Sequence, residues 1–340
     1  MQRGSYRAVQ ASAAGKLELV ERAVTEPPPG KVRIAVEACG ICHSDSITVD
    51  GPFPNLQYPR VPGHEVIGKI DALGEHVTGW AVGQRVAVGF LAGPCLHCNP
   101  CRRGDFVSCV NQGATGVTSD GGYADVMIAD QYALAAVPDA LSSIDAAPLI
   151  CAGLTTFNAL RNSPARAGDL VAIHGIGGLG HLGVQFARAM GFRVAAIARG
   201  SDKAPLAKQL GAHHYIDSQA EDTVAALQAL GGATVILATA SSGAAMSPLL
   251  GGLTRRGTLV AVGVGADPIS VSGKQLVLSS RSIDGSLTGS AIDGEDTLSF
   301  SAMSNIRPMI ETVPLEQAAE AYLRMMQGKA RFRMVLVTGQ

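Results

Sequence analysis

The sequence is poor in aromatic residues and in charge. Only 4% of its 340 residues are Phe, Trp or Tyr, and only 16% are charged. The 27 Lys and Arg residues against 28 Asp and Glu give a formal net charge of −1, and there is no dense block of Lys and Arg. A chain with this balance offers little attraction to nucleic acid or to an anionic membrane surface, so neither is an expected partner.

Long apolar runs are also missing. The N-terminus lacks the apolar segment of a signal peptide, and nowhere do 18 uncharged apolar residues follow one another. We therefore expect a cytoplasmic protein with no membrane partner. Seven cysteines, an odd number, in a chain without an export signal predict reduced thiols that bind metal or take part in catalysis, rather than a disulfide framework.

What the sequence does contain is two kinds of hydrophobic pattern. At roughly 100 to 200 residues per domain, the length predicts two domains. In the first half, apolar and polar residues alternate with a period of two, which indicates β-strands. From about residue 169, short apolar runs alternate with amphipathic segments, which predicts parallel βαβ units and an α/β fold class. The strands expected there are 170–174, 193–198, 234–239 and 257–264.

Four cysteines follow one another within 15 residues, in the pattern C-x-x-C-x-x-C-x7-C: Cys95, Cys98, Cys101 and Cys109. Two-residue spacings let successive thiolates turn toward one ion, and four sulfur ligands suit tetrahedral zinc. Because all four ligands are protein side chains, this zinc would be structural. Two alternatives stay open: unrelated buried thiols or disulfides, and an iron–sulfur cluster, although Val110 stands where a ferredoxin pattern has proline.

The other cysteines predict a second metal site. A catalytic zinc needs three protein ligands and one open position, and a Cys2His set is available: Cys42, His64 and Cys151. Glu65 is a candidate for a residue that supports the metal ligands from behind, or for a fourth ligand itself. Asp45 can accept the hydrogen bond from the other ring nitrogen of His64. The alternatives are a packed histidine and a simple turn carboxylate. Cys39 is interpreted as a core residue.

A glycine-rich segment directly follows one predicted strand and opens a predicted helix. It carries GxGxxG, with four glycines as candidate contacts to a cofactor: Gly175, Gly177, Gly178 and Gly180. In such a loop the glycines allow a tight turn, backbone approach to a pyrophosphate and close packing of helix on strand. The sequence therefore predicts a dinucleotide site, the alternative being a glycine-rich turn of another α/β domain.

The residues after the next strand bear on the choice of cofactor. NAD binding normally needs a carboxylate there for the ribose hydroxyls, but Ala198 and Arg199 occupy these positions. Arg199, with Ser201 and Lys203 behind it, could bind a 2′-phosphate, which favours NADP over NAD. The alternative is that Arg199 is a solvated cation and Asp202 contacts the ribose.

With these motifs in this order, the chain resembles the zinc-dependent medium-chain alcohol dehydrogenases over essentially its whole length. The matching stretches are 39–45, 63–65, the four-cysteine segment, 151–156 and the glycine loop. The resemblance implies a GroES-like β-rich catalytic domain at 1–152, completed by 290–340. It also implies a Rossmann domain with a doubly wound parallel sheet at 153–289.

The resemblance also implies roles for individual residues. Catalytic zinc would be held by Cys42, His64 and Cys151, and Ser44 would accept the alcohol proton. The cofactor would contact residues from both domains: His43, Thr155, Val262, Leu287 and Arg333. Two aromatic residues would line the substrate pocket: Phe53 and Phe90. One departure is Ile47, which stands where many relatives have a histidine that passes the proton to solvent.

The expected activity is therefore hydride transfer between a primary alcohol or aldehyde and NADP(H), with two zinc ions per chain. We expect a homo-oligomer, either a dimer or a tetramer. Two alternatives remain at this point. One is a zinc-free, quinone-reductase-like member of the same superfamily, and the other is a zinc-ribbon binding module, which would explain the four-cysteine segment alone.

Overall fold

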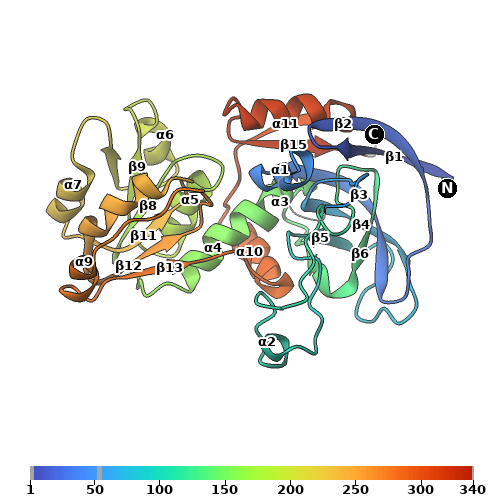
Figure 1. Cartoon of the computed structure of the whole chain (residues 1–340), viewed down its shortest axis with the longest axis horizontal. Helices are drawn as coiled ribbons and strands as arrows, with labels where there is room; N and C mark the ends of the chain where they lie inside the picture. Colours follow the sequence, from blue (N-terminus) through green and yellow to red (C-terminus); the bar gives the residue numbers. More distant parts are fainter. Residues whose placement is uncertain (1–3, 52–55, 339–340) are drawn as a thin grey trace. The chain divides into compact units, whose positions relative to one another are not determined.

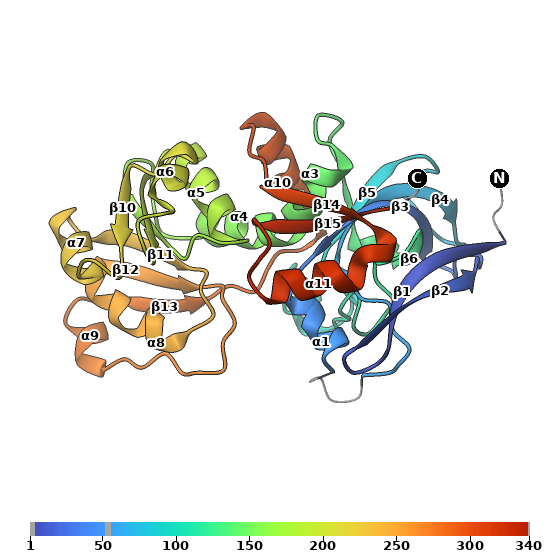
Figure 2. The same ribbon diagram turned by 90° about the horizontal axis from the view of Figure 1, so that it is seen from above.

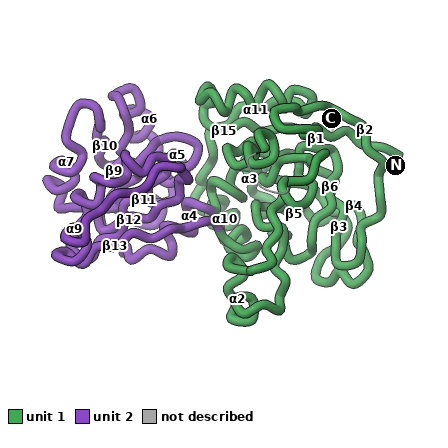
Figure 3. Tube along the Cα trace, in the orientation of Figure 1, with its two compact units in different colours: residues 1–154, 289–340 green, residues 155–288 purple. Residues whose placement is uncertain are grey.

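A computed structural model of the chain describes residues 4–51 and 56–338. It divides into two compact units, shown in different colours in Figure 3. Unit 1 contains residues 1–154 and 289–340, and unit 2 contains residues 155–288. Unit 1 is rich in β-strands and unit 2 is built on a parallel sheet, which confirms the predicted fold class.

Within the described residues, unit 1 holds a seven-stranded sheet and a separate antiparallel pair, β1 and β2 (Figure 1). The large sheet has the order β14-β15-β3-β4-β5-β7, with β6 also paired to β3. Because β15 pairs with β3, the C-terminal segment completes this unit. The strand bounds are β1 (Ser5–Ala13), β2 (Lys16–Ala23), β3 (Lys31–Ile41), β4 (Glu65–Leu73), β5 (Arg85–Val88), β6 (Val126–Asp130), β7 (Leu134–Ala136), β14 (Ile310–Pro314) and β15 (Arg333–Val337).

The helices of unit 1 are short, apart from two near the C-terminus. Ala318, Ala321 and Tyr322 of α11 pack into the same core as the inward residues of β3 and β4. The loop that carries α2 projects from the rest of the unit (Figure 1). The helix bounds are η1 (His43–Asp45), α1 (Ser46–Val49), α2 (Asn99–Arg102), η2 (Gln131–Ala133), α3 (Ser143–Pro148), the π-helix η3 (Leu149–Gly153), α10 (Ala291–Met303), η5 (Leu315–Gln317) and α11 (Ala318–Met326).

Unit 2 is a six-stranded sheet, counted over its described residues, in the order β10-β9-β8-β11-β12-β13, with every pair parallel. Numbered from β8, this order is 3-2-1-4-5-6, the doubly wound arrangement in which dinucleotides bind at the carboxyl ends of the strands, where the order reverses. The strand bounds are β8 (Leu170–His174), β9 (Arg193–Ala198), β10 (His214–Asp217), β11 (Ala233–Ala238), β12 (Leu253–Ala261) and β13 (Ser282–Gly285).

Helices cover both faces of this sheet. Figure 2 shows α5 and α6 on one side and α8 and α9 on the other. Leu182, Phe186 and Ala187 of α5 are fully buried, as the 3.6-residue spacing predicts. The helix bounds are α4 (Leu154–Arg161, whose first residue belongs to unit 1), α5 (Gly180–Ala189), α6 (Ala204–Gln209), α7 (Thr223–Ala229), α8 (Gly243–Met246), η4 (Ser247–Gly252) and α9 (Gly273–Val277).

The predicted strand 257–264 is partly wrong. In the structure β12 is Leu253–Ala261, and residues 262–264 lie beyond it. The reason is that β12 pairs with β11 up to Ala238 and with β13 up to Gly285, so its own ladder ends at Ala261. The apolar residues that follow therefore belong to the loop at the carboxyl edge of the sheet.

One helical stretch of the described chain, Ser143–Arg161, is long and apolar enough to cross a membrane by length and composition alone. It combines α3, η3 and α4. Of its most apolar window, 78% is buried inside the protein, as is typical of a core helix.

Candidate functional site

The elements of unit 1 bring the predicted ligands of the second metal site together. Cys42 directly follows β3 and His64 directly precedes β4. These strands are antiparallel neighbours, with Gly40 opposite Glu65, so the end of one lies beside the start of the other. Cys151 reaches the same place from the π-helix η3. Sequence spacing could not indicate this meeting, because 109 residues separate the two cysteines.

The donor atoms of Cys42, His64, Glu65 and Cys151 all lie within 4.8 Å of one another. The two Sγ atoms are 3.9 Å apart, and Cys151 Sγ is 3.4 Å from His64 Nε2. Two thiolates bound to one tetrahedral zinc at about 2.3 Å stand about 3.8 Å apart. The spacing and the Cys2His donor set therefore fit zinc.

The electrostatics of the group favour a cation. The Nδ1 atom of His64 donates to Asp45 Oδ1 at 3.0 Å, so Nε2 is the ring nitrogen left to face a metal. A hydrogen bond with Cys151 holds the pKa of Cys42 well below its usual value, against the effect of burial. Burial alone would lower the pKa of His64. The negative charges of Asp45 and Cys42 outweigh this effect and raise the pKa well above its usual value. The site thus stabilises positive charge.

Glu65 has a partner that the sequence did not indicate. Its Oε1 accepts from the Arg333 guanidinium, while Oε2 is buried without a hydrogen-bond partner. A Cβ at Gly40 would lie 1.9 Å from Oε2, so only glycine leaves room for this carboxylate. Burial raises the pKa of Glu65 to about 7, although the charge of Arg333 opposes the shift. An unpartnered buried oxygen beside two sulfurs fits the predicted role of Glu65 next to a metal.

Arg333 is 5% exposed and its side chain contacts Glu65. Its predicted contact with the cofactor pyrophosphate stays a prediction. The predicted proton acceptor Ser44 lies half-buried on η1, and His43 beside it, predicted to contact the cofactor, is exposed. Ile47 follows on α1. The Phe90 ring meets the His64 ring edge-on, with centroids 5.1 Å apart, whereas Phe53 lies outside the described residues.

The four-cysteine segment forms a second group of donors. The Sγ atoms of Cys95, Cys98, Cys101 and Cys109 lie within 4.8 Å of one another, and all are free thiols. Cys98 and Cys109 are 3.9 Å apart, again close to the sulfur spacing around zinc. The Asn111 amide donates to Cys95 and holds its pKa at about 5. The four sulfur donors therefore fit a single metal ion bound by four cysteines. None of these thiols is paired in a disulfide.

The glycine loop of unit 2 joins the end of β8 to the start of α5. Gly175 has φ +93°, a left-handed conformation that glycine adopts without strain. A Cβ at Gly180 would lie 1.7 Å from the Gly175 carbonyl oxygen, so helix and strand can only meet here through glycine. A Cβ at Gly177 would meet nothing within 4 Å, which leaves open space above the loop. Gly178 completes the turn before α5.

The residues after β9 lie at the carboxyl edge of the same sheet. Ala198 is buried at the end of the strand, and Arg199 and Ser201 are exposed. Lys203 Nζ donates to the Ile176 carbonyl of the glycine loop at 3.2 Å, a contact that the sequence did not indicate. Three further residues predicted near the cofactor are Thr155 on α4, Val262 just after β12 and the exposed Leu287.

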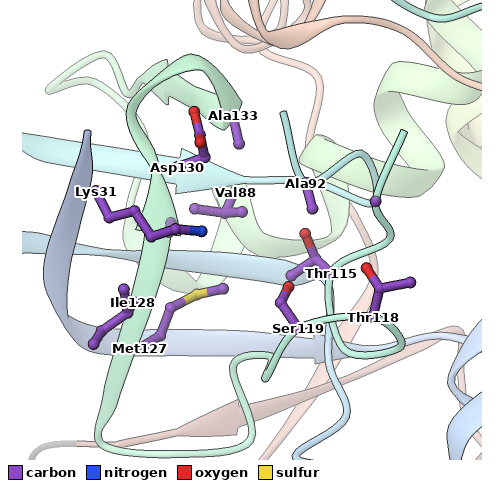
Figure 4. A pocket seen from close by; sticks show the side chains of 12 residues that line it. Lys31, Val88, Ala92, Thr115, Thr118, Ser119, Met127, Ile128, Asp130 and Ala133 are labelled. Atoms are coloured by element: carbon purple, nitrogen blue, oxygen red, sulfur yellow. The ribbon is translucent and has the colours of Figure 1, made fainter. Parts of the chain in front are cut away.

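Unit 1 has two pockets whose lining residues belong to neither donor group. The larger, of about 230 Å³, lies between β5, β6 and the 113–119 loop, with Lys31, Thr115 and Met127 among its lining residues (Figure 4). The smaller pocket, of about 20 Å³, is lined by Phe90 and Ile150 among others.

Comparison with known families matches both units. Residues 28–139 match the alcohol dehydrogenase GroES-like domain, and residues 178–306 match the zinc-binding dehydrogenase family. Alcohol dehydrogenase patD of Penicillium expansum is 41% identical over 323 residues, covering 94% of each chain. NADP-dependent alcohol dehydrogenase C of Mycobacterium bovis is 36% identical, covering 92% of each chain.

Solved structures show the same likeness. A crystal structure of an NAD-dependent alcohol dehydrogenase superposes with a TM-score of 0.90 at 27% identity, over 98% of this chain and all of the other. The relatives therefore include proteins named for NADP and for NAD. The matches span more than nine-tenths of the chain, which a four-cysteine binding module would not explain.

Proposed function

Because the chain belongs to the zinc-dependent medium-chain alcohol dehydrogenase family, we propose that it interconverts a primary alcohol and an aldehyde with NADP(H). The observation that supports this best is the buried group of two cysteines, one histidine and one glutamate whose donor atoms lie within 4.8 Å. A catalytic zinc held there would supply a Lewis acid to the substrate oxygen.

The chain's own residues would do the rest of the chemistry. Cys42, His64 and Cys151 would hold the ion, and the Asp45 contact to His64 fixes which ring nitrogen faces it. Ser44, two residues after Cys42, would accept the alcohol proton. With Ile47 following, no histidine is available there for a second transfer, so the proton would leave Ser44 through water or a cofactor group.

The test combines metal analysis with one assay. Zinc-replete protein should contain two ions per chain and should reduce benzaldehyde with NADPH. One ion with full activity would contradict the catalytic zinc, and two ions without oxidoreductase activity would contradict the proposed reaction.

The preference for NADP is supported by the charge at the carboxyl end of β9. Arg199 is exposed, and neither a hydrogen bond nor an ion pair of its side chain is found in the described structure, so it is free to meet a 2′-phosphate. The nearby carboxylate of Asp217 accepts hydrogen bonds from the backbone N–H groups of Gly200 and Gln219. Arg199 thus stands where a chain that binds NAD normally has a carboxylate.

Replacing Arg199 by Ala should raise KM for NADPH by roughly tenfold or more, because a charge-assisted contact contributes about 1.5 to 3 kcal/mol. KM for NADH should stay unchanged. The matched control is Arg255→Ala, an exposed arginine near the start of β12, at the opposite edge of the sheet. Steady-state kinetics with both cofactors decide the matter, and equal effects on NADPH and NADH would overturn the preference.

We also propose a homo-oligomer and a cytoplasmic location. The outermost strand β13 leaves one edge of the unit 2 sheet unpaired within the described chain, and Val277 and Leu278 nearby are largely exposed. Seven free cysteines suit a reducing compartment. Light scattering of the purified protein would show a single chain mass if the oligomer proposal is wrong.

A further inference from the structure

One buried polar side chain beside the donor group has no part in the proposed chemistry. The hydroxyl of Tyr123 donates to Asp45 Oδ2 at 2.8 Å, and the backbone N–H of Cys42 donates to the same oxygen at 2.8 Å. The other oxygen of Asp45 accepts from His64 Nδ1 at 3.0 Å. Tyr123, Asp45 and His64 are each at most 2% exposed. A continuous chain of hydrogen bonds therefore runs from Tyr123 to a predicted ligand.

The backbone of Tyr123 is fixed to the segment that precedes His64. Tyr123 N donates to the Pro62 carbonyl and Gly122 N to the Gly63 carbonyl, each at 3.0 Å. A Cβ at Gly63 would lie 2.4 Å from Tyr123 Cδ1, so glycine is needed for the ring to pack against this backbone. The position of the hydroxyl is thus set by the same segment that sets the position of His64.

The two oxygens of Asp45 have separate tasks. With two donors on Oδ2, the carboxylate cannot rotate without breaking both hydrogen bonds, so Oδ1 stays directed at His64. Without the tyrosine hydroxyl, Oδ2 would keep only the Cys42 amide in a buried setting, where each hydrogen bond matters more than in water. Burial also raises the pKa of Tyr123 well above its usual value, so its hydroxyl keeps the proton that it donates.

We propose that Tyr123 is a positioning residue of the catalytic metal site. Its hydroxyl holds the Asp45 carboxylate in the orientation that fixes the His64 ring, with Nδ1 bonded to Asp45 and Nε2 turned toward the ion. This inference rests on the proposed zinc function. Tyr123 and Asp45 are 78 residues apart in the sequence and meet only in the folded unit.

The first test is Tyr123→Phe, which removes one oxygen and keeps the ring. Loss of an outer partner of a metal ligand typically costs about 10- to 100-fold in metal affinity, and Tyr123 is one hydrogen bond further out. We therefore expect about tenfold faster release of one of the two zinc ions to a chromogenic chelator. The ion of the four-cysteine segment should be released as in the wild type.

The matched control is Tyr322→Phe. Tyr322 is also buried and its hydroxyl also contacts an aspartate, Asp50 Oδ2, at 3.0 Å, but Asp50 is outside both donor groups. This variant should release both ions at the wild-type rates. Equal acceleration in both variants would mean a general loosening of the unit and would overturn the proposal.

Two further readouts separate positioning from a merely structural role. Asp45→Asn alone should speed release of the same ion, and adding Tyr123→Phe should then have little further effect, since the two residues act through one carboxylate. Additive effects would contradict the proposal.

In wild-type protein labelled with ¹³Cζ-tyrosine, removal of the catalytic ion should shift the Tyr123 resonance and leave that of Tyr322 in place. A Tyr123 resonance that does not respond overturns the proposal even if the variant fails to fold.

These outcomes are distinct from those that test the function. A wild-type protein with only one zinc ion contradicts the catalytic zinc itself. Two ions in the wild type, with unchanged release in Tyr123→Phe, contradict only the role of Tyr123.

Discussion

Cys42→Ser is expected to lower kcat/KM for aldehyde reduction by roughly a thousandfold or more. A serine hydroxyl stays protonated at neutral pH and is a poor replacement for a thiolate ligand. Without the Lewis acid, several kcal/mol of charge stabilisation in the transition state are lost, and about 4 kcal/mol corresponds to a thousandfold in rate. His64→Ala should have the same effect, because it removes the nitrogen donor 3.4 Å from Cys151.

Both variants should still bind NADPH, because the glycine loop belongs to unit 2 and the ligands to unit 1. Metal analysis should give one zinc ion instead of two. Cys39→Ala is the matched control: Cys39 is fully buried three residues earlier but is not among the donors. It should keep both ions and most of the activity. Substantial turnover in Cys42→Ser would rule out the assignment of this residue as a zinc ligand.

Cys95→Ser should instead destabilise the fold. The segment from Cys95 to Cys109 has only the short helix α2, so a bound ion would be its main internal support. An ion present at a thousand times its dissociation constant stabilises the folded state by about 4 kcal/mol, and this contribution would be lost. Calorimetry should show a lower Tm for unit 1, and proteolysis should cut first within this segment.

The control for this second prediction is His97→Ala. His97 lies in the same segment and its ring contacts the Cys95 carbonyl, but it is exposed and outside the donor group. Its replacement should leave the zinc content at two and Tm nearly unchanged. If chelator-treated wild-type protein and Cys95→Ser both keep the wild-type Tm, the four cysteines have no structural ion.

Much of unit 2 could be predicted because its signals are local. The strands at 170–174 and 193–198 were predicted with the bounds that the structure has. Each is an apolar run bounded by turn residues, and the glycine loop between them forms one short turn. The end of β12 could not be predicted in this way, because it depends on where the neighbouring strands stop.

Unit 1 was predicted less completely. Its β-rich character follows from the period of two, but neither the sheet order nor the π-helix that presents Cys151 has a local signal. The return of β15 to pair with β3, about 300 residues away in sequence, was known only through the family resemblance. Pairing between distant strands depends on tertiary packing, which short-range patterns do not encode.

The sequence alone determined the donor types and the glycine spacing, because two-residue spacing and a strand–turn–helix are short-range properties. Only the tertiary structure decided which distant groups meet. It placed Glu65 against Arg333 and Tyr123 against Asp45, at separations of 268 and 78 residues. No pattern in the chain marks these pairs, since a buried carboxylate finds its partner through the packing of separate strands.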